Sequence, residues 1–360
     1  MPSRLIWLSL AGAALNAWLA CALFLPGAWM GRNDFLSFYS GARLAGTARL
    51  YDAPAARRIQ ADAIGESFPA VGYTRLPYFA LLLKPLAALP YRAAYAVWLC
   101  CSAAAFIGFA LLWPAGARKW PLLCWSLPAW VALFNGQDVG FLLLFVAAAA
   151  ALSRRGRDFA AGAALALCAA KFHLFLLLPV VVVAQRRWNM LAGTATGGAV
   201  LAALSFAAAG PAWPRQYLAD LADPTLDAGL THMPGLRAFY GGIPGAGYIQ
   251  AAILLALAAL VWLIARRHKS FEQPLAIALA AGISGAFHAY LADCALLLPA
   301  ILTLWPRGRA VALATPVPWF LLQMPPLFAA LPRLLIAAVV VQRPRTSNST
   351  GRATAFTAGS

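Results

Sequence analysis

The sequence predicts an all-α membrane protein that crosses the bilayer many times. Of its 360 residues, 62% are hydrophobic and 11% are charged, with a mean hydropathy of +0.74, whereas a soluble domain carries about 25% charged residues. The apolar segments lack the alternating pattern of an outer-membrane barrel, so helices are the only spanning structure left. The cations gather in short clusters between these segments, as membrane topology produces. A soluble sheet-rich enzyme is therefore excluded, and the net charge of +17 does not predict nucleic-acid binding.

The first predicted span follows Arg4 and is apolar from Leu5 to Leu25. It is longer than the roughly 7 to 15 residues of a signal-peptide core, so we interpret it as an uncleaved helix. Several later segments are shorter than the ~20 residues of an upright spanning helix, and we expect half-helices or helices around a water-filled cavity there. Pro332 and Arg333 interrupt the last segment. We predict eleven or twelve spans, drawn from residues 5–26, 93–113, 120–134, 138–152, 158–170, 172–185, 189–209, 248–265, 274–290, 292–305, 309–323 and 325–341.

Six basic clusters set the predicted orientation, since cytoplasmic loops carry an excess of Lys and Arg. Two long loops, 27–75 and 210–247, then lie on the extracytoplasmic side, and the first is expected to carry amphipathic helices. On this topology, segment 76–90 does not cross the membrane completely, and it is predicted to be interfacial or re-entrant. The chain is thus one membrane domain, residues 1–342, with a disordered tail, residues 343–360. The clusters are residues 117–119, 154–157, 185–188, 265–269, 307–309 and 343–345.

The acidic residues segregate on this topology, although they were not used to build it. Only Asp158 and Glu272 face the cytoplasm. This segregation supports the orientation. The outward-facing acids are Asp34, Asp52, Asp62, Glu66, Asp138, Asp220, Asp223, Asp227 and Asp293.

Four polar clusters interrupt the apolar runs, and all four fall on the predicted outer face. Lys171 and His173 are the most informative, because they lie within the apolar stretch 158–185. A charge deep in the membrane costs roughly 2.5 to 3.5 kcal/mol on insertion scales, so we predict a helical hairpin with these two residues at its tip. The clusters are residues 32–39, 135–138, 171–173 and 287–293.

Together these clusters predict an extracytoplasmic cavity. A carboxylate such as Asp34 can accept a hydroxyl proton, Lys and protonated His can hold a phosphate, and amides and aromatic faces suit a sugar. The alternative is that each group is an ordinary polar residue at the end of a span. Arg75, Lys84 and Arg237 are interpreted as snorkelling side chains. The predicted cavity residues are Asp34, Asn135, Gln137, Lys171, His173 and His288, with Tyr39 as an aromatic face.

From about residue 5 to 305, the chain resembles glycosyltransferase family 87, whose members are membrane glycosyltransferases of the GT-C fold. Five motifs carry the resemblance in order: NDFLSFYSGARLAGTARLYD, YTRLPYFALLLKPLAALP, NGQD, ALALCAAKFHLFLLLPVVVVAQRRW and HAYLADCALLLPA. Two motifs depart from the family. TRLP (74–77) stands where a Tyr-Pro-Pro element is expected, and KFH (171–173) stands where the family often has Lys-Pro-Gln. These departures concern the identity of the donor and acceptor more than they concern the type of reaction.

The resemblance implies a GT-C-type bundle that transfers a hexose, mannose in known members, from a polyprenyl-phosphate sugar to a hydroxyl of a lipid or glycan acceptor, with inversion. It implies that Asp34 is the catalytic base. A monophosphate leaving group can be stabilised by Lys or His, and no tight acidic cluster flanks Asp34, so we expect no metal and no other cofactor. The site is expected to face the periplasm or cell exterior from the plasma (inner) membrane. The residues assigned to the donor phosphate or sugar are Lys171, His173, His288, Asn135, Gln137 and Tyr39.

Two other functions remain open from the sequence. A transporter or flippase for an anionic lipid or sugar would also need outward cations and an intramembrane lysine. A non-catalytic lipid-binding partner in cell-envelope synthesis is the second alternative. The long aromatic and acidic loop directly after the first span favours the enzyme, and the lack of a visible internal repeat disfavours a transporter built from two related halves.

Overall fold

The computed structural model describes residues 3–65, 72–115, 119–222, 229–230 and 233–303. Every regular element within these residues is a helix, and no strand occurs among them. The predicted all-α class is therefore confirmed.

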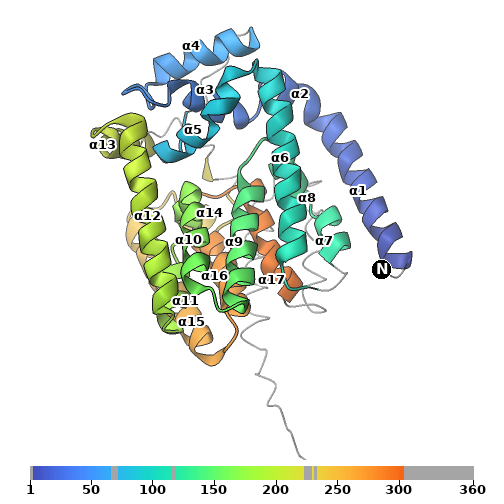
Figure 1. The fold of residues 1–360 in the computed structure, drawn as a ribbon, viewed down its shortest axis with the longest axis vertical. Helices are drawn as coiled ribbons and strands as arrows, with labels where there is room; N and C mark the ends of the chain where they lie inside the picture. Colours follow the sequence, from blue (N-terminus) through green and yellow to red (C-terminus); the bar gives the residue numbers. More distant parts are fainter. Residues whose placement is uncertain (1–2, 66–71, 116–118, 223–228, 231–232, 304–360) are drawn as a thin grey trace, which may run out of the picture.

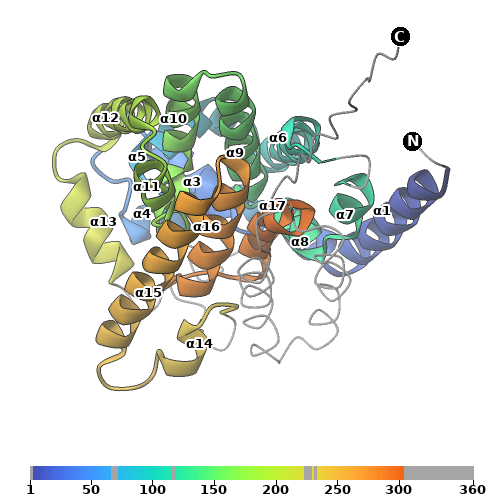
Figure 2. The ribbon, with the colours of Figure 1, turned by 90° about the horizontal axis from the view of Figure 1, so that it is seen from below.

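Four helices are long and apolar enough to cross a membrane, and two of them, α1 and α12, lie at opposite edges of the bundle (Figures 1 and 2). Their outward faces carry large apolar side chains, such as Trp18 on α1 and Phe206 on α12. Such faces suit contact with lipid tails. The chain is thus a polytopic membrane protein. The four helices are α1 (Ser3–Leu23), α6 (Tyr91–Leu112), α12 (Trp188–Ala209) and α15 (Ala246–Arg267).

The other predicted spans that the structure describes form shorter helices, and some of them are interrupted. The span predicted at 120–134 divides at Ser126, and Pro128 stands in the first turn of its second half, where a missing N–H costs nothing. The hairpin predicted at 158–185 has a non-helical residue, Lys171, near its tip. The spans predicted at 309–323 and 325–341 lie outside the described residues. The short elements are α7 (Lys119–Trp125), α8 (Leu127–Phe134), α9 (Val139–Arg154), α10 (Asp158–Ala166), η2 (Leu167–Leu174), α11 (Leu178–Ala184), α16 (Glu272–Gly285), η5 (Leu291–Leu297) and α17 (Leu298–Thr303).

A cap of short helices covers one end of the bundle (Figure 1). Its helix α4 begins where the Asp52 carboxylate accepts a hydrogen bond from the Ala55 N–H (3.0 Å) and ends at Gly65, whose φ of 72° is left-handed. Segment 76–90 forms a short helix and a 3₁₀ turn that do not cross the bundle, as predicted. The elements of the cap are α2 (Leu25–Trp29), α3 (Phe35–Leu44), α4 (Ala53–Ile64), α5 (Pro77–Leu83) and η1 (Lys84–Ala88); α13 (Trp213–Leu221) and α14 (Arg237–Tyr240) lie in the second long loop.

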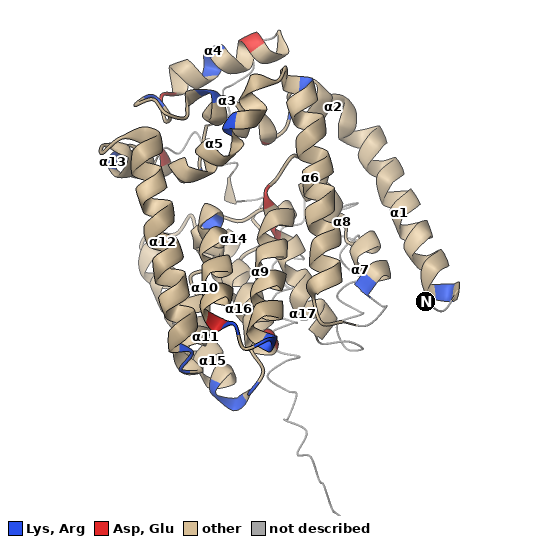
Figure 3. Ribbon diagram, in the orientation of Figure 1, with Lys and Arg blue, Asp and Glu red and all other residues tan. Residues whose placement is uncertain are grey.

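The opposite end gathers three of the predicted basic clusters, 154–157, 185–188 and 265–269 (Figure 3). The two acids assigned to this side are ion-paired there. Arg154 lies 3.3 Å from Glu272, and Arg187 lies 3.1 Å from Asp158. The predicted grouping of Asp158 and Glu272 with these basic clusters at one end therefore holds.

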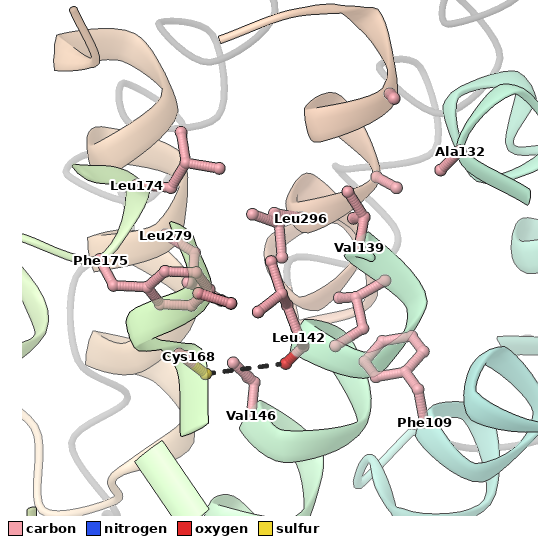
Figure 4. Close-up of a cluster of buried hydrophobic side chains, with 14 of the residues drawn as sticks. Phe109, Ala132, Val139, Leu142, Val146, Cys168, Leu174, Phe175, Leu279 and Leu296 are labelled. Carbon is pink, nitrogen blue, oxygen red and sulfur yellow. Dashed lines mark hydrogen bonds between the residues drawn. The ribbon is translucent and has the colours of Figure 1, made fainter. Parts of the chain in front are cut away.

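The core between the two ends is apolar and tightly packed. Figure 4 shows Leu142 and Val146 of α9 facing Cys168 of η2 and Leu296 of η5. Close helix crossings depend on glycine, since a Cβ on Gly162 would collide with the carbonyl oxygen of Met190 in α12. This packing fixes the hairpin of α10, η2 and α11, and with it the position of the polar residues at its tip.

Candidate active site

Asp34 lies in the cap, directly before α3, and its carboxylate is not used to cap that helix. Asn33 does so instead, because its side-chain oxygen accepts a hydrogen bond from the Leu36 N–H (3.1 Å). The Asp34 carboxylate accepts hydrogen bonds from the side-chain amides of Asn135 (3.1 Å) and Gln137. A role of Asp34 as a simple helix cap is therefore contradicted.

The loop between α8 and α9 approaches Asp34 closely enough to bind it through the backbone as well. The Asp34 N–H donates to the Asn135 carbonyl oxygen (3.0 Å). Gly136 makes this approach possible, because its φ is 68° and an added Cβ would lie 2.6 Å from the Cβ of Phe35. The Asn-Gly-Gln sequence thus delivers two amide donors to one carboxylate oxygen.

Lys171 is the buried centre of the adjoining network. Its ammonium group donates to the Gln137 side-chain oxygen (2.8 Å) and to the Asp293 carboxylate (2.5 Å), and it lies 3.4 Å from an oxygen of Asp138. All three partners are buried. An ammonium group has three N–H bonds; two of them donate to Gln137 and Asp293, and the positive charge also attracts the nearby Asp138 carboxylate.

Gln137 is consequently held in one orientation. Its oxygen must face the Lys171 ammonium, which only donates, and its NH₂ group must then face Asp34. Lys171 therefore determines that the NH₂ group of Gln137, and not its oxygen, faces Asp34.

Arg75 completes the network from the start of segment 76–90. Its guanidinium contacts both carboxylate oxygens of Asp138, at 2.7 and 3.3 Å, and packs over the Phe38 ring at 5.3 Å. Only 7% of Arg75 is exposed. The interpretation of Arg75 as a snorkelling side chain is therefore wrong, because a buried carboxylate of α9 holds its charged end inside the protein.

His173 and His288 form an aromatic group next to this network. Their ring centres lie 5.9 Å apart, and His288 also packs against Tyr290 at 4.8 Å. The Tyr290 N–H donates to Asp293 (2.9 Å), which joins the group to the network. The Nε2 atom of His173 is buried and has no hydrogen-bond partner among the described residues. Its hydrogen-bonding capacity is thus unused by the described residues.

Tyr39 is the one predicted site residue that the structure places apart. Its buried hydroxyl donates to the Leu89 carbonyl oxygen (2.9 Å) and accepts from Arg43 (2.8 Å). Its ring lines a separate hollow of about 280 Å³ under α4, together with Arg43 and Asp62. Tyr39 therefore does not contact the Asp34 network directly.

The environment of Asp34 changes its acidity. Burial raises the pKa of its carboxyl to about 6, although the positive charges of Lys171 and Arg75 oppose the shift. Part of the side chain remains accessible. A carboxylate with this pKa is largely ionised at pH 7 and is a stronger base than an ordinary aspartate.

Sequence reasoning did not assign Arg75, Asp138 or Asp293 to the site. The signal was present for the two acids, which end the NGQD and FHAYLAD motifs and were placed on the same face as Asp34. Their pairing with Lys171 and Arg75 depends on how three hairpin tips meet. Among the described residues, no group of three or more His, Cys, Asp or Glu side chains is placed to hold a metal ion.

Comparison with known protein families shows the class of the protein. The model of glycosyltransferase family 87 matches residues 73–291, more than half of the chain. The chain belongs to glycosyltransferase family 87. This membrane glycosyltransferase acts on a sugar donor and an acceptor, and the transporter and non-catalytic alternatives lose their support.

The matched region contains most of the site but not all of it. Asn135, Gln137, Lys171, His173 and His288 lie within it, whereas Asp34 and Tyr39 precede it. The hydrogen bonds from Asn135 and Gln137 therefore connect Asp34 to the region that the family model matches. No curated protein and no solved structure matches the chain.

Proposed function

We propose that the glycosyltransferase moves a hexose, with mannose as the first candidate, from a polyprenyl-phosphate sugar to a hydroxyl of a lipid or glycan acceptor on the extracytoplasmic face. The supporting observation is the Asp34 carboxylate, which two amides orient and burial makes more basic. The polyprenyl chain would stay in the bilayer while the sugar phosphate reaches the cap end of the bundle.

Asp34 acts as the general base in this proposal. It accepts the proton of the acceptor hydroxyl while the hydroxyl oxygen attacks the anomeric carbon. The bond between that carbon and the phosphate oxygen breaks, and the polyprenyl phosphate leaves with the bonding electrons. Attack opposite the leaving group inverts the anomeric configuration. No metal is required in this scheme, because cations can stabilise the leaving phosphate.

The two histidines are the proposed contacts for the donor. The His173 Nε2 atom is buried, has no hydrogen-bond partner in the part of the chain that the structure describes, and can hydrogen-bond to a phosphate or sugar oxygen. His288 packs against it. Lys171 donates to Gln137 and Asp293 and lies beside Asp138, so its proposed contribution is positive potential at the donor phosphate.

The Asn135 and Gln137 amides have two proposed roles. Each donates to Asp34, which keeps the carboxylate pointed at one position. In the second role, the same amides hydrogen-bond to the sugar. Tyr39 can serve only a more distant part of the substrate, since it lines the separate hollow under α4.

The substitution Asp34→Asn tests the proposal. Asparagine keeps the shape of the side chain but cannot accept the proton, so turnover should fall by roughly 10² to 10⁴, the range of general acid–base catalysis. The assay is transfer of mannose from polyprenyl-phosphate mannose to a panel of lipid acceptors by purified enzyme in detergent. NMR of the product reports whether the configuration inverts.

The matched control is Asp52→Asn, which changes a carboxylate at the start of α4 in the same cap and keeps a side-chain oxygen to accept from the Ala55 N–H. This variant should keep parental turnover. Asp34→Asn should keep parental donor binding and thermal stability. If Asp34→Asn turns over at nearly the parental rate, Asp34 is not the base, and family membership is unaffected.

A further inference from the structure

A basic hollow of about 610 Å³ lies at the end of the bundle opposite Asp34, between the α11–α12 and α15–α16 loops. Figure 3 shows the Lys and Arg residues of these loops at the lower end of the bundle. None of the residues proposed for the transfer reaction lines it. The residues that define the basic hollow here are Arg186, Arg187, Trp188, Arg266, His268 and Lys269.

The Gln185 side chain holds the two loops of the basic hollow together. The Gln185 side-chain NH₂ donates to the carbonyl oxygens of His268 and Ser270, both at 2.9 Å. The turn that follows places Arg186 at a φ of 55°, the one positive φ among the described non-glycine residues. The hollow is therefore shaped by packing between loops rather than by a chance gap.

The charge in the basic hollow is not balanced by protein groups. Its one carboxylate, Asp158, pairs with Arg187 at 3.1 Å. The side chains of Arg186 and Lys269 are exposed and make no hydrogen bond or ion pair with another described residue. Membrane topology accounts for cations at one end of a bundle, but it does not account for their arrangement around a concave site.

The position of the basic hollow points to a lipid rather than a soluble ligand. It lies where two spanning helices end, at the first residue of α12 and the last turn of α15. Trp188, which lines it, is 58% exposed, and tryptophan is enriched at the headgroup level of membranes. Basic pockets between spanning helices bind anionic headgroups.

We infer that the basic hollow binds the phosphate headgroup of an anionic phospholipid, at the end of the protein opposite the transfer site. Arg186 and Lys269 supply charge-assisted hydrogen bonds to the phosphate oxygens. The lipid tails run along α12 and α15, whose outer faces are apolar.

Native mass spectrometry of the purified full chain, titrated with phosphatidylglycerol, tests this inference. The variant Arg186→Gln/Lys269→Gln should bind the lipid about 30-fold more weakly, since each cation near an anionic lipid contributes about a factor of five. The control Arg155→Gln removes an exposed cation from the same end but outside the hollow, and it should bind as the parent does. Gln185→Ala, which frees the two loops without changing charge, should also weaken binding.

Three results would overturn the inference. Equal binding of phosphatidylglycerol by the parent, the double variant and the control would show that the hollow is not the site. Equal binding of phosphatidylcholine and phosphatidylglycerol by the parent would show that the protein does not select lipids by the negative charge of the headgroup. Binding of pyrophosphate alone, with the same dependence on Arg186 and Lys269, would assign the hollow to a soluble phosphate compound instead of a lipid. Sugar transfer is not an arm of this test, so its outcome is independent of the role of Asp34.

Discussion

Replacing Lys171 with methionine should destabilise the protein strongly, because the buried network has no other group to take its place. Only 5% of the Lys171 side chain is exposed, and it lies 2.5 Å from Asp293, whose side chain is 4% exposed. In Lys171→Met, Asp138 keeps Arg75, whereas Asp293 keeps the Tyr290 N–H as its one hydrogen-bond donor among the described residues. Breaking a buried ion pair from one side costs about 3–5 kcal/mol, and we expect the free energy of unfolding to fall by that amount.

A second substitution separates the stability lost with the Lys171–Asp293 ion pair from the stability lost with the lysine side chain itself. Lys171→Met/Asp293→Asn removes both charges, so the double variant should be about 1–3 kcal/mol more stable than the sum of the two single changes predicts. The control Lys84→Met changes an exposed lysine whose ammonium donates to the Ala45 carbonyl oxygen (3.1 Å), and it should stay within about 0.5 kcal/mol of the parent.

Equilibrium unfolding in mixed micelles, followed as the fraction of SDS increases, measures these differences. Asp34→Asn should not share the large loss, because its amide partners remain and no buried ion pair is broken. A Lys171→Met protein as stable as the Lys84→Met control would refute the reasoning. So would strict additivity of the Lys171 and Asp293 changes, since it would mean that the two charges do not interact.

Three further predictions concern the base, the packing and the orientation. Because Asp34 must be ionised to accept a proton and its pKa is raised to about 6, kcat/KM should be constant near pH 7 and fall about tenfold per pH unit below pH 6; a pH–rate profile that stays flat to pH 4.5 would argue against Asp34 as the base. Gly162→Ala should push α10 from α12 and cost about 1–3 kcal/mol of stability, whereas Gly198→Ala, with open space at its Cβ, should cost nothing in the same unfolding assay. In a background without native cysteines, Asp62→Cys should react with an impermeant thiol reagent added outside intact cells and Arg155→Cys should not; the reverse pattern would invert the topology.

The sequence alone was enough to predict the class of the protein and the two ends of its bundle. A chain with 11% charged residues and long apolar runs cannot fold as a soluble domain, because spanning segments must satisfy their backbone hydrogen bonds internally and therefore form helices. The basic clusters predicted which loops share an end, and the pairs Arg154–Glu272 and Arg187–Asp158 confirm that grouping. Both predictions rest on local composition, which the sequence carries directly.

The partners of each polar side chain were decided only by the tertiary structure. Lys171 was recognised as a residue that needs a partner, but its contacts with Gln137 and Asp293 lie 34 and 122 positions away in the chain. Arg75 was taken for a snorkelling residue because a cation next to an apolar segment looks the same whether its charge reaches water or a buried carboxylate. Hairpin tips from four parts of the chain meet at the Asp34 network, and hydropathy and charge patterns do not encode how such tips meet. Their meeting depends on close packing of helices in the apolar core, where glycines such as Gly162 set the helix separation.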